Sequence, residues 1–183
     1  ANSEATARLL DGIGGTVFTL GDNAYSSGTT DDFKNCYEPT WGRHKARTRP
    51  SPGNHDYATP GAAPYYAYFG LNAGTPGVGY YSFTLGAWHI ISLNSNVPTD
   101  PSSAQMAWLK QELAASTARF RIILNSVPMP RFELLGWREL VFVQLVPIVF
   151  AKSFSISGNP GFHAGGHEQH LLIGGSVGCC PTI

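Results

Sequence analysis

Residues 16–25 read Thr16-Val17-Phe18-Thr19-Leu20-Gly21-Asp22-Asn23-Ala24-Tyr25, a run of β-formers followed by a turn. The run predicts a short buried strand. Gly21 lets the backbone turn sharply where that strand ends, and Asp22 then stands where a carboxylate can bridge two metal ions. Tyr25 can point back to the same place and bind a trivalent ion as a phenolate. Taken alone, a Gly-Asp pair after a strand more often forms an ordinary turn.

A second turn, Ser51-Pro52-Gly53-Asn54-His55-Asp56, gives the first one a chemical meaning. The amide oxygen of Asn54 is a neutral metal ligand, and the imidazole of His55 can protonate a departing oxygen or hold a phosphate oxygen. Asp56 can orient the ring of His55, as carboxylates beside functional histidines commonly do. Each motif alone is also consistent with a plain turn. Together they indicate a hydrolase with two cations about 3.5–4 Å apart.

Around these turns, hydrophobic periodicity and capping signals predict a mixed α/β fold. Helices are predicted over Ser3–Leu10 with Gly12 as the stop, Asp31–Tyr37 with Thr30 as the cap, and Pro101–Ser116 with Asp100 as the cap. Besides residues 16–20, strands are predicted over Tyr80–Leu85 and Trp88–Leu93, which form a hairpin, and over Phe120–Leu124. No element is predicted after residue 125.

Three further expectations concern single residues. His89, inside the hairpin, is expected to be a packed or edge residue, and His44 is expected to be solvated because it lies in the basic segment Trp41-Gly42-Arg43-His44-Lys45. The aromatic residues are expected to pack under the loop after His55; they are Tyr65, Tyr66, Tyr68 and Phe69.

Size and composition indicate one soluble domain over residues 1–183. Twelve basic and twelve acidic residues cancel, which argues against nucleic acid or an anionic membrane surface as a partner. The longest apolar stretch, Leu140 to Ala151, is shorter than the roughly 20 residues that cross a bilayer.

The two motifs and the text around them resemble the purple acid phosphatases of the calcineurin-like metallophosphoesterase superfamily. The matching segments run in family order from about Ala7 to Leu124; they are GDNAYSSGT, CYEPTWGRHKARTRPSPGNHDY, YYAYFG, GYYSFTLGAWHIISLNSN and WLKQEL. The Gly-Asp-x-x-Tyr form separates this branch from relatives that lack the tyrosine. Residues 1–124 are thus family-like, whereas residues 125–183 diverge.

The resemblance implies a β-sandwich flanked by helices, incomplete in this chain, with a dinuclear centre of Fe(III) and Fe(II), Zn(II) or Mn(II). Asp22 would bridge both metals, Tyr25 would bind the iron(III), and Asn54 would bind the second metal. His55 would contact the substrate or protonate the leaving group. The implied reaction is hydrolysis of a small phosphate monoester by metal-bound hydroxide, and the resemblance favours a secreted or periplasmic location.

Other parts of the family pattern differ. The first metal-binding motif of the family would precede Ala1, and Asn125-Ser126-Val127-Pro128 stands where the family places histidines before a proline. Near the end the family has Gly-His-x-His, but this chain has Gly166-His167-Glu168-Gln169-His170. Ligands could come from His163, His167 and His170. Alternatively, a reading-frame slip after about Arg121 replaces the family sequence.

The sequence therefore leaves three functions open. The leading one is a metal-dependent phosphomonoesterase. The others are a phosphodiesterase using the same site and a catalytically inactive fragment or binding domain of the same fold.

Overall fold

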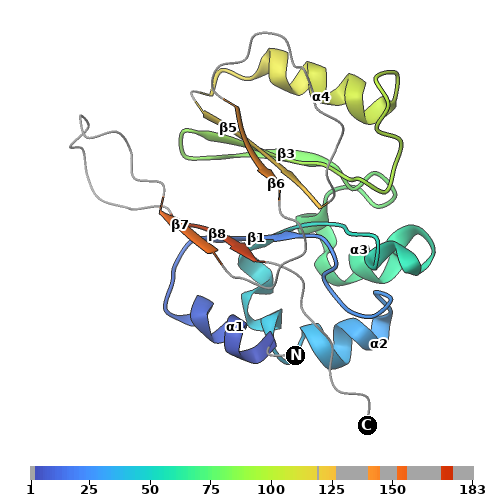
Figure 1. The fold of residues 1–183 in the computed structure, drawn as a ribbon, viewed down its shortest axis with the longest axis vertical. Coiled ribbons are helices and arrows are strands. Elements are labelled where there is room, and N and C mark those ends of the chain that lie inside the picture. The colour runs from blue at the N-terminus through green and yellow to red at the C-terminus, as the bar shows by residue number, and fades with distance from the viewer. Residues whose placement is uncertain (1–2, 119, 127–139, 145–151, 156–169, 175–183) are drawn as a thin grey trace.

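The computed structural model describes residues 3–118, 120–126, 140–144, 152–155 and 170–174. These residues form two four-stranded sheets, with strand orders β2-β1-β8-β7 and β3-β4-β5-β6. Figure 1 shows one sheet above the other, with α4 beyond the upper sheet and α1 and α2 beyond the lower one. The predicted α/β class is confirmed.

The first sheet is built around β1 (Thr16–Leu20), whose predicted bounds are confirmed. It pairs in parallel with β2 (Thr48–Ser51) on one side and with β8 (His170–Gly174) on the other. β8 in turn pairs antiparallel with β7 (Lys152–Ser155). Because β1 and β2 run in the same direction, both strands end at the same edge of the sheet.

The second sheet is centred on β4 (Trp88–Ser92). With β3 (Tyr81–Leu85) it forms the predicted hairpin, and it pairs in parallel with β5 (Phe120–Asn125). β5 pairs in parallel with β6 (Leu140–Gln144). Strands β6, β7 and β8 lie in the part of the chain where the sequence predicted no element.

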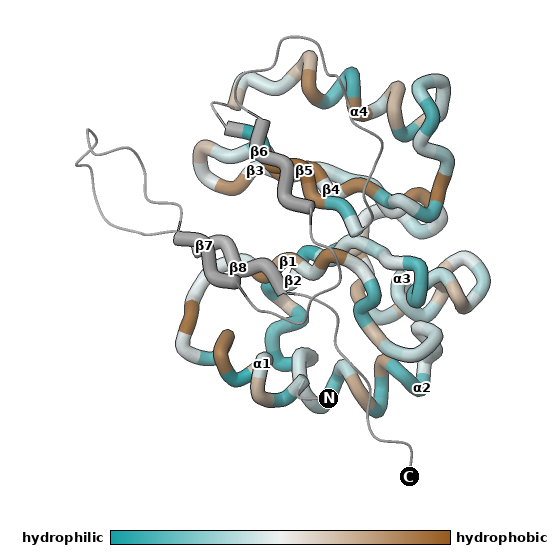
Figure 2. The backbone as a smooth tube through the Cα atoms, in the orientation of Figure 1, coloured by the Kyte–Doolittle hydropathy of each residue, from teal (hydrophilic) through white to brown (hydrophobic). Residues whose placement is uncertain are grey.

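The two sheets face each other across a shared apolar core. Its buried members come from the facing sides of β1, β4 and β5; they are Phe18, Leu20, Ile90, Ile122 and Leu124. Side chains alternate along a strand, so Val17 joins a different core on the opposite face of β1. Figure 2 shows the hydrophobic colour along β3, β4 and β5 of the upper sheet. Burial of both faces explains why β1 has apolar residues on both sides, Val17 on one and Phe18 and Leu20 on the other.

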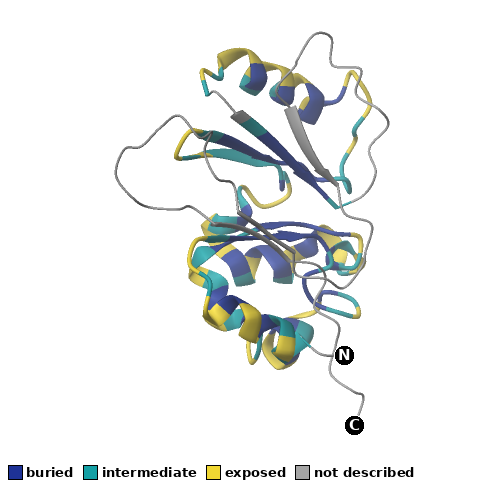
Figure 3. Ribbon diagram, turned by 60° about the vertical axis from the view of Figure 1, so that its left-hand side comes forward, coloured by how far each residue is buried: buried dark blue, intermediate teal, exposed yellow. Residues whose placement is uncertain are grey.

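Helices cover the outer faces of both sheets. α4 (Ala104–Ala115) contributes Met106, Leu109 and Leu113 to a core with Ile91 and Ile123. The aromatic-rich core beneath β1 is enclosed by α1 (Ser3–Asp11), η1 (Phe33–Tyr37) and α3 (Ala63–Phe69). Figure 3 shows these helices buried toward the sheets and exposed on their outer sides. None of the described helices is long and apolar enough to cross a bilayer.

Short helical turns complete the described segments. They are α2 (Thr30–Asp32), η2 (Trp41–Arg47), η3 (Asp56–Ala58), η4 (Pro60–Ala62) and η5 (Gly70–Ala73).

Two predicted helix caps are wrong by one to three residues. α4 is capped by Ser103, whose Oγ accepts the Met106 N–H at 3.3 Å, and not by Asp100. Asp100 instead closes a turn in which its carbonyl accepts the Ser103 N–H at 3.0 Å. α2 is capped by Thr29, because Thr29 and Asp32 form a reciprocal capping box. The chain then continues from α2 into the π-helical turn η1.

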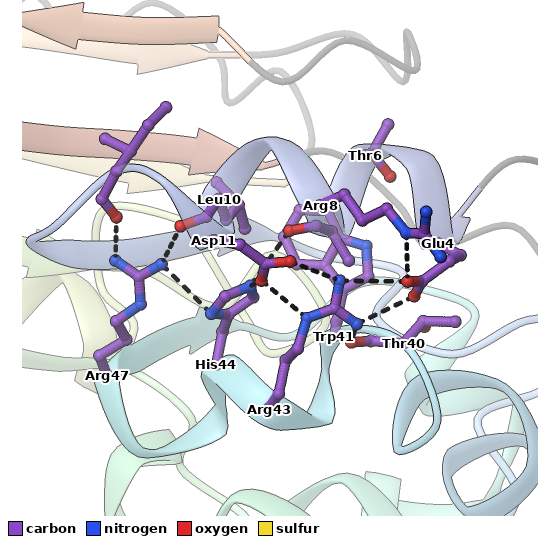
Figure 4. A network of polar contacts seen from close by, with 12 residues as sticks. Glu4, Thr6, Arg8, Leu10, Asp11, Thr40, Trp41, Arg43, His44 and Arg47 are labelled. Carbon is purple, nitrogen blue, oxygen red and sulfur yellow. Dashed lines mark hydrogen bonds and ion pairs between the residues drawn. The ribbon is translucent and has the colours of Figure 1, made fainter.

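The expectation that His44 is solvated is also wrong, because α1 docks against η2 and buries the ring. Figure 4 shows the polar network between these two elements. His44 Nε2 lies 3.1 Å from both the Ala7 carbonyl and Asp11 Oδ1. Arg43 binds Glu4 and Asp11, and its N–H groups hold the pKa of both carboxyls below the usual value.

The expectations for His89 and for the aromatic residues agree better with the structure. His89 is a buried strand residue as predicted, with Nε2 3.3 Å from Glu112 Oε2. Tyr66 lies under the loop after His55, where its hydroxyl is 3.2 Å from that of Tyr57. Tyr68 differs, since its ring stacks at 4.9 Å on Phe33 of η1.

Phe18 tests whether the two sheets share one core. Its side chain is fully buried and stacks on Phe83 of the facing sheet at 5.9 Å. Phe18→Ala should therefore lower the free energy of unfolding by about 3–5 kcal/mol, measured by urea denaturation. Leu71→Ala, at a site that is 98% exposed, should change it by less than about 0.5 kcal/mol. Equal effects of the two substitutions would contradict the packing.

Candidate functional site

The candidate site lies where β1 and β2 end side by side. Leu20 and Ser51 are paired in the parallel register, so the Gly21-Asp22 and Pro52-Gly53 turns leave the sheet together. Such edges commonly carry functional side chains, because the sheet fixes the position of each loop.

Glycine is required where the two turns touch. A Cβ on Gly53 would lie only 2.2 Å from the backbone nitrogen and the Oδ1 atom of Asp22. Gly21 has a φ of 90°, which disfavours any other residue, and its own Cβ would lie 2.4 Å from that of Ser126. Asp22 has a φ of 52°, a region that aspartate enters more readily than most residues. The close approach of the two turns sets the direction of the Asp22 carboxylate.

Asp22 joins Tyr25 and His55. Its Oδ2 atom accepts the Tyr25 hydroxyl at 2.9 Å, and its Oδ1 atom accepts the His55 backbone N–H at 3.1 Å. The rings of Tyr25 and His55 pack against each other with centroids 4.4 Å apart. Three of the four residues predicted to form the centre of the site therefore meet. The fourth, Asn54, lies on the same loop with its side chain exposed.

The His55 ring is held through Nδ1, which lies 2.6 Å from the Ser26 carbonyl. A carbonyl only accepts hydrogen bonds, so Nδ1 must carry a proton. In the neutral ring Nε2 is then the unprotonated nitrogen, free to accept a proton or, once charged, to donate one.

Asp56 differs from the prediction that it orients the His55 ring. Its carboxylate is fully buried and accepts hydrogen bonds from the Gly53 N–H at 2.8 Å, the Asn23 Nδ2 at 2.9 Å and the Asn23 N–H at 3.1 Å. Asp56 thus fastens the two turns to each other. Burial raises the pKa of Asp56 to about 6, although these N–H donors favour the charged form.

Sequence reasoning missed a layer of small polar residues behind the site. Asn23 donates to the Ser51 carbonyl at 2.9 Å, which ties the first turn to the end of β2. The hydroxyls of Ser51 and Ser92 are 2.7 Å apart and connect the two sheets. Ser126 donates to the Pro52 carbonyl at 3.1 Å. The signal that could have found this layer is the recurrence of serine and asparagine at or just after the ends of the buried strands.

The oxygens of Asp22 and Tyr25 fit neighbouring positions around one cation. Two oxygen ligands with bonds of about 2.0–2.2 Å stand roughly 3 Å apart, close to the observed 2.9 Å. No cluster of three or more His, Cys, Asp or Glu side chains suited to a metal ion occurs among the described residues. A dinuclear centre needs ligands beyond Asp22, Tyr25 and Asn54.

The histidines proposed as further ligands are not at this edge where the structure describes them. His170 begins β8, which runs parallel to β1 with Leu171 opposite Thr16. Its backbone therefore lies at the opposite end of the strands from Asp22. His163 and His167 lie outside the described residues.

Comparison of the chain with protein-family models found no match, and comparison with curated proteins found none either. The functional argument therefore depends on the geometry of the site.

Substitution of Asp56 tests its fastening role. Asp56→Ala leaves three N–H donors without their acceptor and should lower the free energy of unfolding by about 2–4 kcal/mol in urea denaturation at pH 7. Asp31→Ala, at an exposed carboxylate in the first turn of α2, is the matched control and should cost less than about 1 kcal/mol. A similar small loss in both variants would show that Asp56 fastens nothing.

The raised pKa of Asp56 also predicts a pH dependence. The folded chain holds this proton more tightly than the unfolded chain, whose Asp pKa is about 3.9. The stabilisation is fully present below about pH 4 and is lost as pH rises through about 6. Relative to Asp56→Asn, which does not titrate, the wild type should lose about 2 kcal/mol between pH 4 and pH 7. Parallel stability curves would contradict the shift.

Proposed function

We propose that this chain is a metal-dependent phosphoesterase that hydrolyses phosphate monoesters. The observation that carries the proposal is the meeting of the Asp22 carboxylate, the Tyr25 hydroxyl and the His55 backbone at the ends of two parallel strands. Carboxylate, phenol and amide oxygens suit hard cations, and an adjacent imidazole suits proton transfer.

The architecture supports the proposal. Two facing sheets with helices on their outer sides are what a metallophosphoesterase-type sandwich requires. The proposal therefore includes a metallophosphoesterase-type sandwich as the fold of this chain.

The proposed roles combine these contacts with the resemblance seen in the sequence. Asp22, Tyr25 and Asn54 would hold the metal, with Asp22 as the bridging ligand of a dinuclear Fe(III) centre whose second ion is Fe(II), Zn(II) or Mn(II). Such a centre, when bound, activates water and neutralises the charge that develops on the phosphoryl group. His55 keeps Nδ1 on the Ser26 carbonyl and exchanges a proton with the leaving oxygen through Nε2. Asp56 keeps the two turns in register.

A second candidate is a phosphate-binding domain without turnover. It is favoured by Ser126, a serine that directly follows β5 where the resembling family places a histidine. Diester hydrolysis would use the same site with a longer groove. Turnover of a small monoester separates the leading proposal from both alternatives.

Asp22 and Tyr25 test the metal role. Wild-type protein supplied with iron and zinc should hydrolyse p-nitrophenyl phosphate and show a violet absorption band from the phenolate of Tyr25. Tyr25→Phe should lose the band, and Asp22→Asn should lose both metal, by elemental analysis, and at least about 100-fold of turnover. Asp31→Asn, an exposed carboxylate elsewhere, should match the wild type. A colourless, inactive wild type would end the phosphatase proposal.

His55 tests the proton transfer. Loss of a general acid hurts most when the leaving group is a poor one, so His55→Ala should slow hydrolysis of an alkyl phosphate by about 10²–10⁴-fold. It should slow p-nitrophenyl phosphate much less, because nitrophenolate departs without a proton. Steady-state kinetics with both substrates makes the comparison. Equal slowing of the two would assign His55 to phosphate binding instead.

A further inference from the structure

Asn94 lies two residues beyond the end of β4 and is fully buried. Its Nδ2 donates to the Tyr57 hydroxyl at 2.8 Å and to the Val78 carbonyl at 3.0 Å. Its Oδ1 accepts the Asn96 N–H at 2.9 Å. Because both donors and the acceptor are in use, the orientation of this amide is fixed.

Two of these bonds lead to opposite ends of the loop that carries Asn54 and His55. At one end Tyr57 follows Asp56 directly, and its N–H reaches the Gly53 carbonyl at 3.3 Å. At the other end Asn96, which Asn94 holds, donates to the Pro52 carbonyl at 3.4 Å. The buried Asn94 side chain therefore holds residues 52–57 at both ends, directly at Tyr57 and through Asn96 at Pro52.

Asn94 is itself anchored to the outer helix. Its backbone N–H donates to Gln105 Oε1 at 2.8 Å, and Gln105 Nε2 donates back to the Asn94 carbonyl at 3.0 Å. Gln105 belongs to α4 and is only 1% exposed. The hydrogen bonds of Asn94 thus connect the loop to α4, a helix outside the site.

We propose that Asn94 is a positioning residue that holds the loop of Asn54 and His55 in register with Asp22. The proposal rests on the proposed function, since it assigns Asn94 to the same site. Its loss would release both ends of the loop and loosen the contact between the His55 N–H and Asp22. Misplacement of reacting groups by about 1 Å can cost roughly 10²-fold in rate.

The substitutions separate the two connections. Asn94→Ala removes both, Tyr57→Phe removes the connection to the carboxyl end of the loop, and Asn96→Ala removes the one to Pro52. Asn94→Asp keeps both, since one oxygen still accepts from Asn96 and the other can accept from the Tyr57 hydroxyl. Against the Val78 carbonyl it replaces a donor with an acceptor, which costs stability but leaves both connections to the loop in place. Leu113→Ala, in the apolar core under α4, is the control for lost stability alone.

Two readouts are needed for each folded variant. The first is the NMR signal of the His55 ring, assigned by its loss in His55→Ala, and the second is kcat and KM for p-nitrophenyl phosphate. Asn94→Ala should shift the His55 signal and lower kcat by about 10–100-fold with little change in KM. Each single-connection variant should give part of that effect. Asn94→Asp should stay near the wild type in both readouts even if it is less stable.

The proposal is overturned if Asn94→Ala leaves the His55 signal and kcat where Leu113→Ala leaves them. It is equally overturned if Asn94→Asp perturbs His55 as strongly as Asn94→Ala. A wild type without turnover would count against the phosphatase, and the His55 signal would then decide the positioning role alone. If Asn94→Ala does not fold, Tyr57→Phe and Asn96→Ala decide the positioning role, because each removes only one of the two connections from Asn94 to the loop.

Discussion

Inside this molecule one buried carboxylate joins two chain segments that the sheet no longer holds. β1 and β2 stop pairing at Leu20 and Ser51, and from there on no backbone ladder fixes the turns. Asp56 replaces the ladder by accepting N–H groups from Gly53 and Asn23. Burying a carboxylate is costly, and such donors offset that cost. The position of Asp22 relative to His55 depends on this cross-link.

The sandwich supports the same edge from its second sheet. β4 and β5 are parallel, so their ends also lie together, and the residues that follow them reach across to the β2 turn. The Ser51–Ser92 pair joins the two sheets directly, and Ser126 reaches Pro52. Short hydroxyl side chains suit this role because they span the narrow distance between two closely packed backbones. The candidate site is therefore built on loops whose backbone is held from two layers.

Whether a feature of this structure could be predicted from the sequence depends mainly on how far apart in the chain the interacting residues lie. The strand of residues 16–20 and the hairpin were predictable because periodicity and turn chemistry are local. The caps were missed because neighbouring Ser, Thr and Asp residues compete for the same N–H groups. In α4 the N-cap is Ser103 and not Asp100. The meeting of Asp22 with Tyr25 was predicted, since only three residues separate them. The bond from Asn23 to Asp56 was not predicted, because 33 residues separate the two. The bond from Gly53 to Asp56 was also missed, although only three residues separate them.

Buried side chains hold the loop in this molecule, so the residues that would contact a substrate differ from the residues that fix the position of the loop. The side chain of Asn54 is exposed, so a change there alters the chemistry of the site but removes none of the described bonds that hold the loop. Asp56 and Asn94 are fully buried and hold the same six-residue loop, residues 52–57, from different sides, one toward β1 and the other toward α4. Each presents the hydrogen-bonding atoms its neighbours need, so even an isosteric exchange of acid for amide would place a donor against a donor or an acceptor against an acceptor. A carboxylate that only accepts and an amide that both donates and accepts thus restrict the loop more narrowly than either could alone.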